Sequence, residues 1–184
     1  MVLEREPELA TARVWLRRWR ADDSEPFARI NSDPDVMRHF PALLTRAESD
    51  ALIGRFNAHF DDYGYGIWAL EIPGVTSLAG FVGFKHVDFD APFAPAVEIG
   101  WRMRRDLWGQ GYATEAAEAV LAHGFDALGF DEIISFTTQD NMRSRAVMER
   151  IGMMRDEAHD FDHPKLPLGH RQRPHVLYRA RRSA

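Results

Sequence analysis

The stretch Trp108-Gly109-Gln110-Gly111-Tyr112-Ala113-Thr114 lies between a predicted strand and a predicted helix. Its two glycines allow backbone conformations that other residues rarely adopt, and they let a ligand approach the main chain closely. Their N–H groups, together with the free N–H groups of the first helical turn, are suited to holding an anion. The natural anion is a diphosphate. Gly-x-Gly alone is a weak signal, because many such turns bind nothing.

The residues on either side of this loop form a strand–loop–helix unit. Before it, a strand is predicted over 96–103, with Val97, Ile99, Trp101 and Met103 on one face and Glu98, Gly100 and Arg102 on the other. After it, alanines and other apolar residues recur at helical spacing up to Gly129, which predicts a helix over 113–128. A strand over 133–138 and a helix over 143–151, ended by Gly152, are expected next.

The rest of the chain supplies further strands and helices. A capping box at Thr45-Arg46-Ala47-Glu48 predicts a helix that ends near Gly64 and Gly66. The other predicted elements are strands over 12–19, 67–72, 78–89, 153–161 and 175–181, a short helix from Asp22 to Ile30, and a helical turn at Asp33-Pro34-Asp35. Strands followed by a β-α-β-α pattern predict an α/β (α+β) fold with a mixed central sheet and helices on both faces.

Composition narrows the class of protein. The 184 residues correspond to about one domain, expected over 1–184. The hydrophobic content of 45% and charged content of 28% are those of a globular protein. The net charge of −5 argues against a nucleic-acid partner, and the acidic N-terminus and lack of long apolar runs argue against a signal peptide or a membrane partner. The chain has no cysteine, which excludes disulfides and a cysteine nucleophile, and a cytoplasmic location is expected.

Two common phosphate-binding loops do not fit. A P-loop requires Gly-Lys-Ser/Thr, which the chain lacks. A dinucleotide fingerprint requires a small residue where Thr114 stands and an acid at the end of the next strand, whereas Glu132 precedes that strand.

The loop instead resembles the coenzyme A pyrophosphate loop of the GNAT acetyltransferases, Arg/Gln-x-x-Gly-x-Gly/Ala. The sequence departs from that pattern at Trp108, and it is similar to the RimJ/RimL-like branch of the family, where WGxGYATEA is common. A second stretch, Asn141-x-x-Ser144 followed by Glu149, Gly152 and Met153, resembles the family's N-x-x-S…E-x-x-G-M/F helix. The resemblance extends over about residues 11–180.

This resemblance implies transfer of an acetyl group from acetyl-CoA to an amine. In the family, the strands matching 96–103 and 133–138 splay apart, and the pantetheine arm lies in the gap. A backbone N–H, expected at Met103, would polarise the acetyl carbonyl. The residues expected to bind the coenzyme are Trp101, Arg102, Met103, Trp108, Gly109, Gln110, Gly111, Tyr112, Ala113, Thr114, Asn141, Ser144 and Arg145.

The catalytic assignments leave alternatives open. Ser144 is the candidate general acid towards the leaving thiolate, and it could instead cap the helix, as Asn141 could. The position where other GNAT branches have a tyrosine is Met148. Glu98 is the candidate general base, and it could instead form an ion pair with an arginine; Glu71 and His86 are weaker candidates.

The predicted reaction is direct transfer to a primary amine, either a protein N-terminus or a small molecule, by a monomer or homodimer. The absence of cysteine closes the common acyl-enzyme route. A coenzyme A-binding sensor or scaffold without turnover is the alternative. No metal is expected, because His159-x-x-x-His163 falls in a predicted strand and loop and not on a helix.

Overall fold

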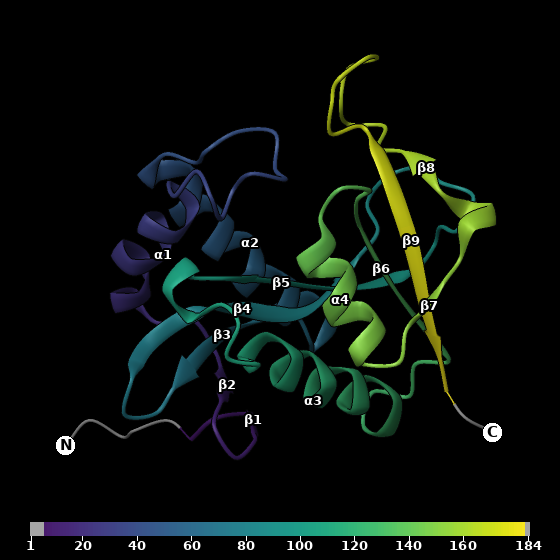
Figure 1. Cartoon of the computed structure of the whole chain (residues 1–184). Helices are drawn as coiled ribbons and strands as arrows, with labels where there is room; N and C mark the ends of the chain where they lie inside the picture. The colour runs from purple at the N-terminus through teal and green to yellow at the C-terminus, as the bar shows by residue number, and fades with distance from the viewer. Residues whose placement is uncertain (1–5, 183–184) are drawn as a thin grey trace.

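The computed structural model describes residues 6–182. Residues 1–5 and 183–184, at the two ends of the predicted 1–184 domain, lie outside the described part, and so does the first half of the acidic N-terminus. Figure 1 shows the chain as a twisted sheet with helices on either side. The elements are β1 (Leu9–Ala10), β2 (Trp15–Arg17), η1 (Ala21–Asp23), α1 (Ser24–Asn31), α2 (Arg46–Tyr63), β3 (Ile67–Ile72), β4 (Thr76–His86), β5 (Val97–Met103), η2 (Arg105–Leu107), α3 (Tyr112–Asp126), β6 (Glu132–Thr138), α4 (Met142–Arg150), β7 (Met154–Arg155), η3 (Glu157–His159), β8 (Phe161–Asp162) and β9 (Pro174–Arg181).

The strands form one mixed sheet. Their order is β1-β2-β3-β4-β5-β6-β9-β7, and β8 pairs with β9. The β5–β6 pair is parallel, and the other described pairs are antiparallel. The predicted α/β fold with a mixed central sheet is therefore confirmed, and β3 and β4 form a hairpin.

The two central strands separate soon after they meet. β4 and β5 are in register from Gly80–Met103 to His86–Val97, whereas β5 and β6 are in register at Glu98 and Ile134. One residue further along, the Ser135 hydroxyl donates to the Ile99 carbonyl at 2.8 Å. Because the strands run parallel, the separation opens towards their C-terminal ends. The splayed strand pair expected from the sequence is present.

Helices cover the two faces of the sheet. Residues of α3 and α4 pack in one apolar cluster with Ile99 and Met103 of β5. Residues of α1 and α2, including Phe27 and Phe56, pack in another with Phe81 of β4. Figure 1 shows α1 and α2 on one side of the β3–β5 strands and α3 along the other. The odd-numbered residues of β5 thus face α3 and α4, and the even-numbered residues face the opposite side.

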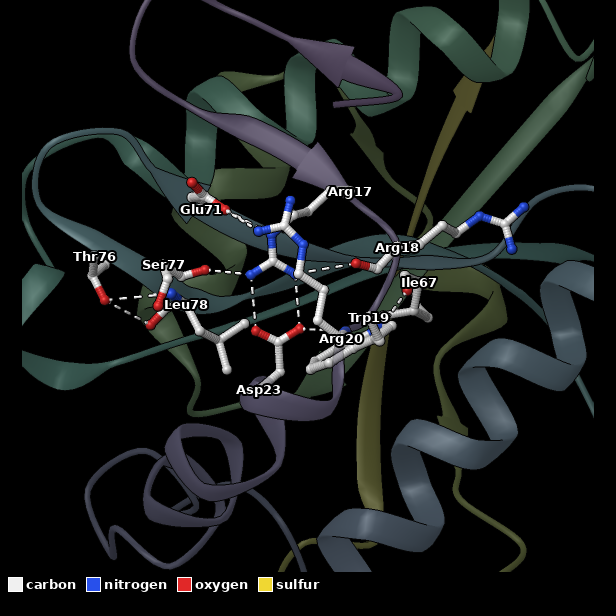
Figure 2. A network of polar contacts seen from close by, with 10 residues as sticks. All are labelled: Arg17, Arg18, Trp19, Arg20, Asp23, Ile67, Glu71, Thr76, Ser77 and Leu78. Carbon is white, nitrogen blue, oxygen red and sulfur yellow. Dashed lines mark hydrogen bonds and ion pairs between the residues drawn. The ribbon is translucent and has the colours of Figure 1, made fainter. Parts of the chain in front are cut away.

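Arg17 is a buried cation with a full set of partners. Two nitrogens of its guanidinium each donate to a different carboxylate oxygen of Asp23, both at 2.8 Å, and Nε donates to Glu71 at 2.7 Å. The carbonyls of Arg18 and Ser77 accept the remaining bonds, and Figure 2 shows this network from close by. Burial opposes the charge, but these partners outweigh it and raise the pKa of Arg17. The network ties β2 to η1 and to the β3–β4 hairpin.

We expect Arg17→Met to lower the free energy of unfolding by about 3–5 kcal/mol, because it leaves Asp23 buried without its counter-charge. For a chain of this size the melting temperature should fall by roughly 6–20 °C. Urea unfolding followed by circular dichroism measures the change. The control Arg18→Met removes a half-exposed ion pair with Glu8 and should cost less than about 1 kcal/mol. Equal losses for both variants would contradict the assigned role of Arg17.

The predicted helical turn at Asp33 is present: the N–H of Met37 donates to the Asp33 carbonyl at 3.0 Å, and the Asp33 carboxylate accepts the N–H of Asp35 at 2.8 Å, as an N-cap does. One predicted element is wrong, and a polar side chain explains it. The predicted strand over 153–161 is interrupted by η3, because the carboxylate of Asp160 accepts the N–H of Leu177 where a strand would use a backbone carbonyl. Among the described residues, no helix is both long and apolar enough to cross a membrane.

Candidate active site

The glycine loop adopts the backbone conformation that anion binding requires. Gly109 and Gly111 have φ angles of +76° and +84°, in the left-handed region that favours glycine. Gly111 is the N-cap of α3, and it supplies no side chain to bond the N–H groups of the first turn. The N–H groups of Tyr112, Ala113 and Thr114 therefore have no acceptor within the helix. Together with the positive end of the helix dipole, they form a cradle for an anion.

Trp108 links three parts of the site. Its indole N–H donates to the carbonyl of Met103, at the end of β5, at 3.0 Å. The guanidinium carbon of Arg143, on α4, lies 4.3 Å from the centre of the indole ring. Trp108 thus fixes the loop against β5 and holds a cation beside it. This residue is the departure from the GNAT pattern, and the structure gives it a bracing role.

Sequence reasoning missed a contact between the N-terminal segment and the loop. Arg13 donates to the Gln110 carbonyl at 3.0 Å and to Glu115 of α3 at 2.6 Å. Thr11 also donates to Glu115. Partial burial opposes ionisation of Glu115, but these bonds outweigh it and lower the pKa of Glu115. Because about a hundred residues separate the partners, no local pattern could reveal this contact.

The main chain of β5 offers free groups to the gap beside β6. The Arg104 N–H donates to the Ala79 carbonyl at 2.8 Å, so Arg104 points towards β4. Successive residues of an antiparallel strand point their main-chain groups in alternating directions. The N–H groups of Met103 and Trp101 therefore point towards β6, into the region where the two strands have separated.

Glu98 is buried at the point where β5 and β6 meet. Its side chain is 9% exposed, and Oε2 lies 3.2 Å from the Lys85 ammonium, although it accepts no hydrogen bond there. Burial raises the pKa of Glu98, and the charge of Lys85 offsets part of this effect. The ion pair considered from the sequence exists, but with a lysine instead of an arginine. A carboxylate with a raised pKa is also what a general base requires.

Asn141 and Ser144, at the start of α4, have different roles in the helix. Asn141 is the N-cap, because its Oδ1 accepts the N–H of Ser144 at 3.3 Å, and its Nδ2 donates to Thr137 at 2.8 Å. The Ser144 hydroxyl is thus not the helix cap. Arg145 donates to the Gln139 carbonyl at 3.0 Å and to the Tyr178 hydroxyl at 3.2 Å, so it also braces α4 against β9.

The weaker candidate bases have other partners. Glu71 accepts from Arg17, and His86 Nε2 lies 2.7 Å from the Tyr65 hydroxyl. In the part of the chain that the structure describes, no group of three or more histidine or acidic residues is placed to hold a metal ion.

Comparisons with known proteins agree with this geometry. The family model described as acetyltransferase (GNAT) domain matches residues 13–154. The FsC-acetyl coenzyme A-N(2)-transacetylase of Aspergillus fumigatus is 30% identical over 171 residues, which cover 83% of this chain and 67% of that protein. The N-acetyltransferase YnaD of Bacillus subtilis is 27% identical over 150 residues, covering 80% and 83% of the two chains.

Solved structures with a similar fold belong to the same group of proteins. A GNAT-family acetyltransferase from Bacillus anthracis matches the structure with a TM-score of 0.77 and 25% identity, covering 94% of this chain and 97% of that one. The family match, the splayed strand pair and the glycine loop at the start of α3 all support one conclusion. This chain belongs to the GNAT family of acetyltransferases.

Proposed function

We propose that the protein transfers an acetyl group from acetyl-CoA directly to a primary amine. The observation that carries this proposal is the position of the glycine loop. The left-handed Gly109 and Gly111 lead into α3 directly after β5, whose end has separated from β6. A diphosphate on the loop would therefore place the pantetheine arm at the gap between the strands.

The coenzyme would contact several main-chain and side-chain groups. The N–H groups from Gly109 to Thr114 would hold the diphosphate, and Gln110 lies within the same loop. Trp101 and Met103 would line the arm through main-chain groups that face β6, whereas the main-chain groups of Arg102 point towards β4. On the α4 side, Asn141, Ser144 and Arg145 would border it, with Trp108 bracing the loop between the two sides.

The reaction needs three events at the thioester. The Met103 N–H would donate to the carbonyl oxygen as negative charge develops there. Glu98 would accept, through intervening water, the proton that the attacking ammonium must lose, because the Cα atoms of Glu98 and Met103 are about 17 Å apart along the strand. The nitrogen–carbon bond forms as the carbon–sulfur bond breaks, and Ser144 would donate a proton to the departing thiolate. Because the chain has no cysteine, no thiol is available for a cysteine acyl-enzyme intermediate.

The test is release of free thiol from acetyl-CoA in the presence of a panel of amines and N-terminal peptides. Thiol release with an amine supports the proposal, and preference for peptides would place the protein in the RimJ/RimL-like branch. Tight coenzyme binding by calorimetry without thiol release from any acceptor would contradict the transferase proposal. That outcome would favour the coenzyme A-binding sensor.

We expect Ser144→Ala to lower kcat on the order of 10²-fold, the usual contribution of a general acid. The thermal stability should not change, because Asn141 and not Ser144 caps α4. Thiol release under saturating substrates measures kcat. Ser32→Ala removes an exposed hydroxyl that bonds the Arg29 carbonyl, and it serves as a control. An unchanged kcat in Ser144→Ala would show that Ser144 is not the acid.

A further inference from the structure

Arg102 is a buried cation for which the described part of the chain supplies no carboxylate. The residue is 8% exposed. Its Nη1 donates to Oδ1 of Asn31, and its guanidinium carbon lies 4.1 Å from the centre of the Phe40 ring and 5.2 Å from that of Phe81. Its Nε is buried and has no hydrogen-bond partner. Among residues 6–182, no aspartate or glutamate forms an ion pair with it.

Arg17 is a buried arginine with a structural role, and its partners differ from those of Arg102. Its side chain is 3% exposed, and Asp23 and Glu71 both bond it, as Figure 2 shows. Those partners raise the pKa of Arg17, whereas desolvation without a counter-charge lowers the pKa of Arg102 to about 10. A buried charge without a partner is costly and is rarely kept unless it has a use. The missing counter-charge is therefore expected on a ligand.

The chain fixes Arg102 in place before any ligand binds. Asn31 is fully buried, and its Nδ2 donates to the hydroxyl of Ser49, also fully buried, at 3.0 Å. This bond, between α1 and α2, orients the Asn31 oxygen towards Arg102. The rings of Phe40 and Phe81 flank the guanidinium. A group held in this way loses little conformational entropy on binding, which is typical of recognition sites.

The strand beside Arg102 has a position without a side chain. Glu98, Gly100 and Arg102 lie on the same face of β5, and Gly100 stands between the two charged residues. Apart from its neighbours in the chain, a Cβ atom built on Gly100 would meet the Glu98 carboxylate at 3.7 Å and no other described atom within 4 Å. The Cα atoms of Glu98 and Arg102 are about 13 Å apart along the strand. The open position above Gly100 thus adjoins the Glu98 carboxylate, and Arg102 follows two residues further along the same face.

We propose that Arg102 binds an anionic oxygen group, a carboxylate or a phosphate, on the molecule whose amine is acetylated. This inference rests on the acetyltransferase function proposed above, and it deepens it by naming the class of acceptor. The ammonium of the acceptor lies between Glu98 and Arg102, and its anionic group pairs with the guanidinium, for which carboxylates and phosphates have matching geometry. The side chain of Arg102 serves the acceptor, while its main chain stays in the strand beside the coenzyme arm.

The experiment compares amines that differ in the anionic group. The acceptors are ω-amino acids from glycine to 6-aminohexanoate, n-alkylamines with the same number of carbons, and aminoalkylphosphonates of matching length. Thiol release gives kcat/KM for each. We expect one of the two anionic series to exceed the alkylamines by about 10- to 100-fold at its best length, which corresponds to hydrogen bonds to a charged group. The carboxylate and phosphonate series then distinguish the two kinds of anion. Equal rates for anionic and neutral amines would overturn the inference.

Variants at Arg102 separate recognition from a structural role. In Arg102→Met the ratio of anionic to neutral kcat/KM should fall to about one, mainly through a higher KM, and Arg102→Lys should restore part of it. The melting temperature of Arg102→Met should change little, because the removal of an uncompensated buried charge is offset by leaving the buried Asn31 oxygen without its donor. The control Arg29→Met changes an exposed arginine on α1 and should keep the wild-type ratio. A lower melting temperature with an unchanged ratio would show that Arg102 is structural.

The design also distinguishes failure of the inference from failure of the proposed function. If no amine releases thiol, the transferase proposal fails, and calorimetry on the coenzyme A-loaded protein decides the inference. Binding of an anionic amine that Arg102→Met loses would support an anion site at Arg102. Absence of such binding in the wild-type protein would overturn it.

Discussion

Gly111→Glu is expected to abolish coenzyme A binding. Gly111 has a φ angle of +84° and is the residue from which α3 starts, so its N–H and those that follow surround the proposed diphosphate. A glutamate side chain would bring a negative charge to the place where the ligand carries its own. It would also strain the backbone, since residues with a Cβ rarely adopt this conformation. Isothermal titration calorimetry with coenzyme A should show a loss of affinity of at least about 10²-fold, equivalent to roughly 3 kcal/mol.

Two further variants separate charge from strain. Gly111→Ala imposes the same backbone strain without a charge, and a Cβ there would lie 3.3 Å from the Arg13 guanidinium, which belongs to a flexible side chain. It should weaken binding less than glutamate does. Gly152→Glu places the same residue at a φ angle of +83° beyond α4, with open space around it, and should leave the affinity unchanged. Wild-type affinity in Gly111→Glu would rule out the loop as the diphosphate site.

Local patterns in the sequence were sufficient to predict the backbone structure around the candidate site where it depends on neighbouring residues. The glycine loop, the helix that follows it and the capping box at Thr45 all follow from backbone preferences within a few residues, and the structure confirms them. The splay of β5 and β6 was expected from the family resemblance. It could not be predicted from the strand patterns alone, because the residues of β6 have the pattern of an ordinary buried strand.

The parts that the sequence could not predict depend on contacts between distant residues. The bonds of Arg13 to the loop join positions about a hundred residues apart. The alternation of β5 predicted correctly that Glu98 and Arg102 share a face. It could not show that both are buried, that Glu98 has a lysine partner, or that Arg102 has no carboxylate partner among residues 6–182. The carboxylate of Asp160 also replaced a backbone partner of Leu177, which interrupted a strand that the residue pattern predicted to continue.

The structure bears differently on the predicted roles of Glu98 and Arg102, the two charged residues of β5. Glu98 was a candidate base because it lay on the polar face of a strand, and burial now gives a physical reason for a raised pKa. Arg102 was expected near the coenzyme, and its side chain instead lies between Phe40 and Phe81 on the face covered by α1 and α2. With both on one face of the strand and the coenzyme gap at its edge, the acceptor is expected to approach from the α1–α2 side.

Glu98→Gln is expected to lower kcat by about 10²–10³-fold, within the usual contribution of a general base. The amide keeps the shape of the side chain but cannot accept the ammonium proton. In the wild-type protein, burial raises the pKa of Glu98, so kcat should fall as the pH decreases through a value above the ordinary pKa of glutamate. The variant should lose this acid limb. The folded wild-type protein holds the proton more tightly than the unfolded chain does. Its stability relative to the variant should therefore fall as the pH rises from the ordinary pKa of glutamate to the raised pKa of Glu98.

Lys85→Met tests whether Glu98 is a base or only one half of an ion pair. The charge of Lys85 lowers the pKa of Glu98 against the effect of burial, so its removal should raise that pKa further. If Glu98 is the base, the acid limb of the Lys85→Met profile moves to higher pH, while the plateau at high pH stays near that of the wild-type protein. If Glu98 serves only the ion pair, Glu98→Gln and Lys85→Met should give pH profiles of kcat that match the wild type. Stopped assays of thiol release between about pH 4 and pH 9 distinguish these results, because that range begins below the ordinary glutamate pKa of about 4.3 and extends in the direction in which burial shifts the pKa of Glu98.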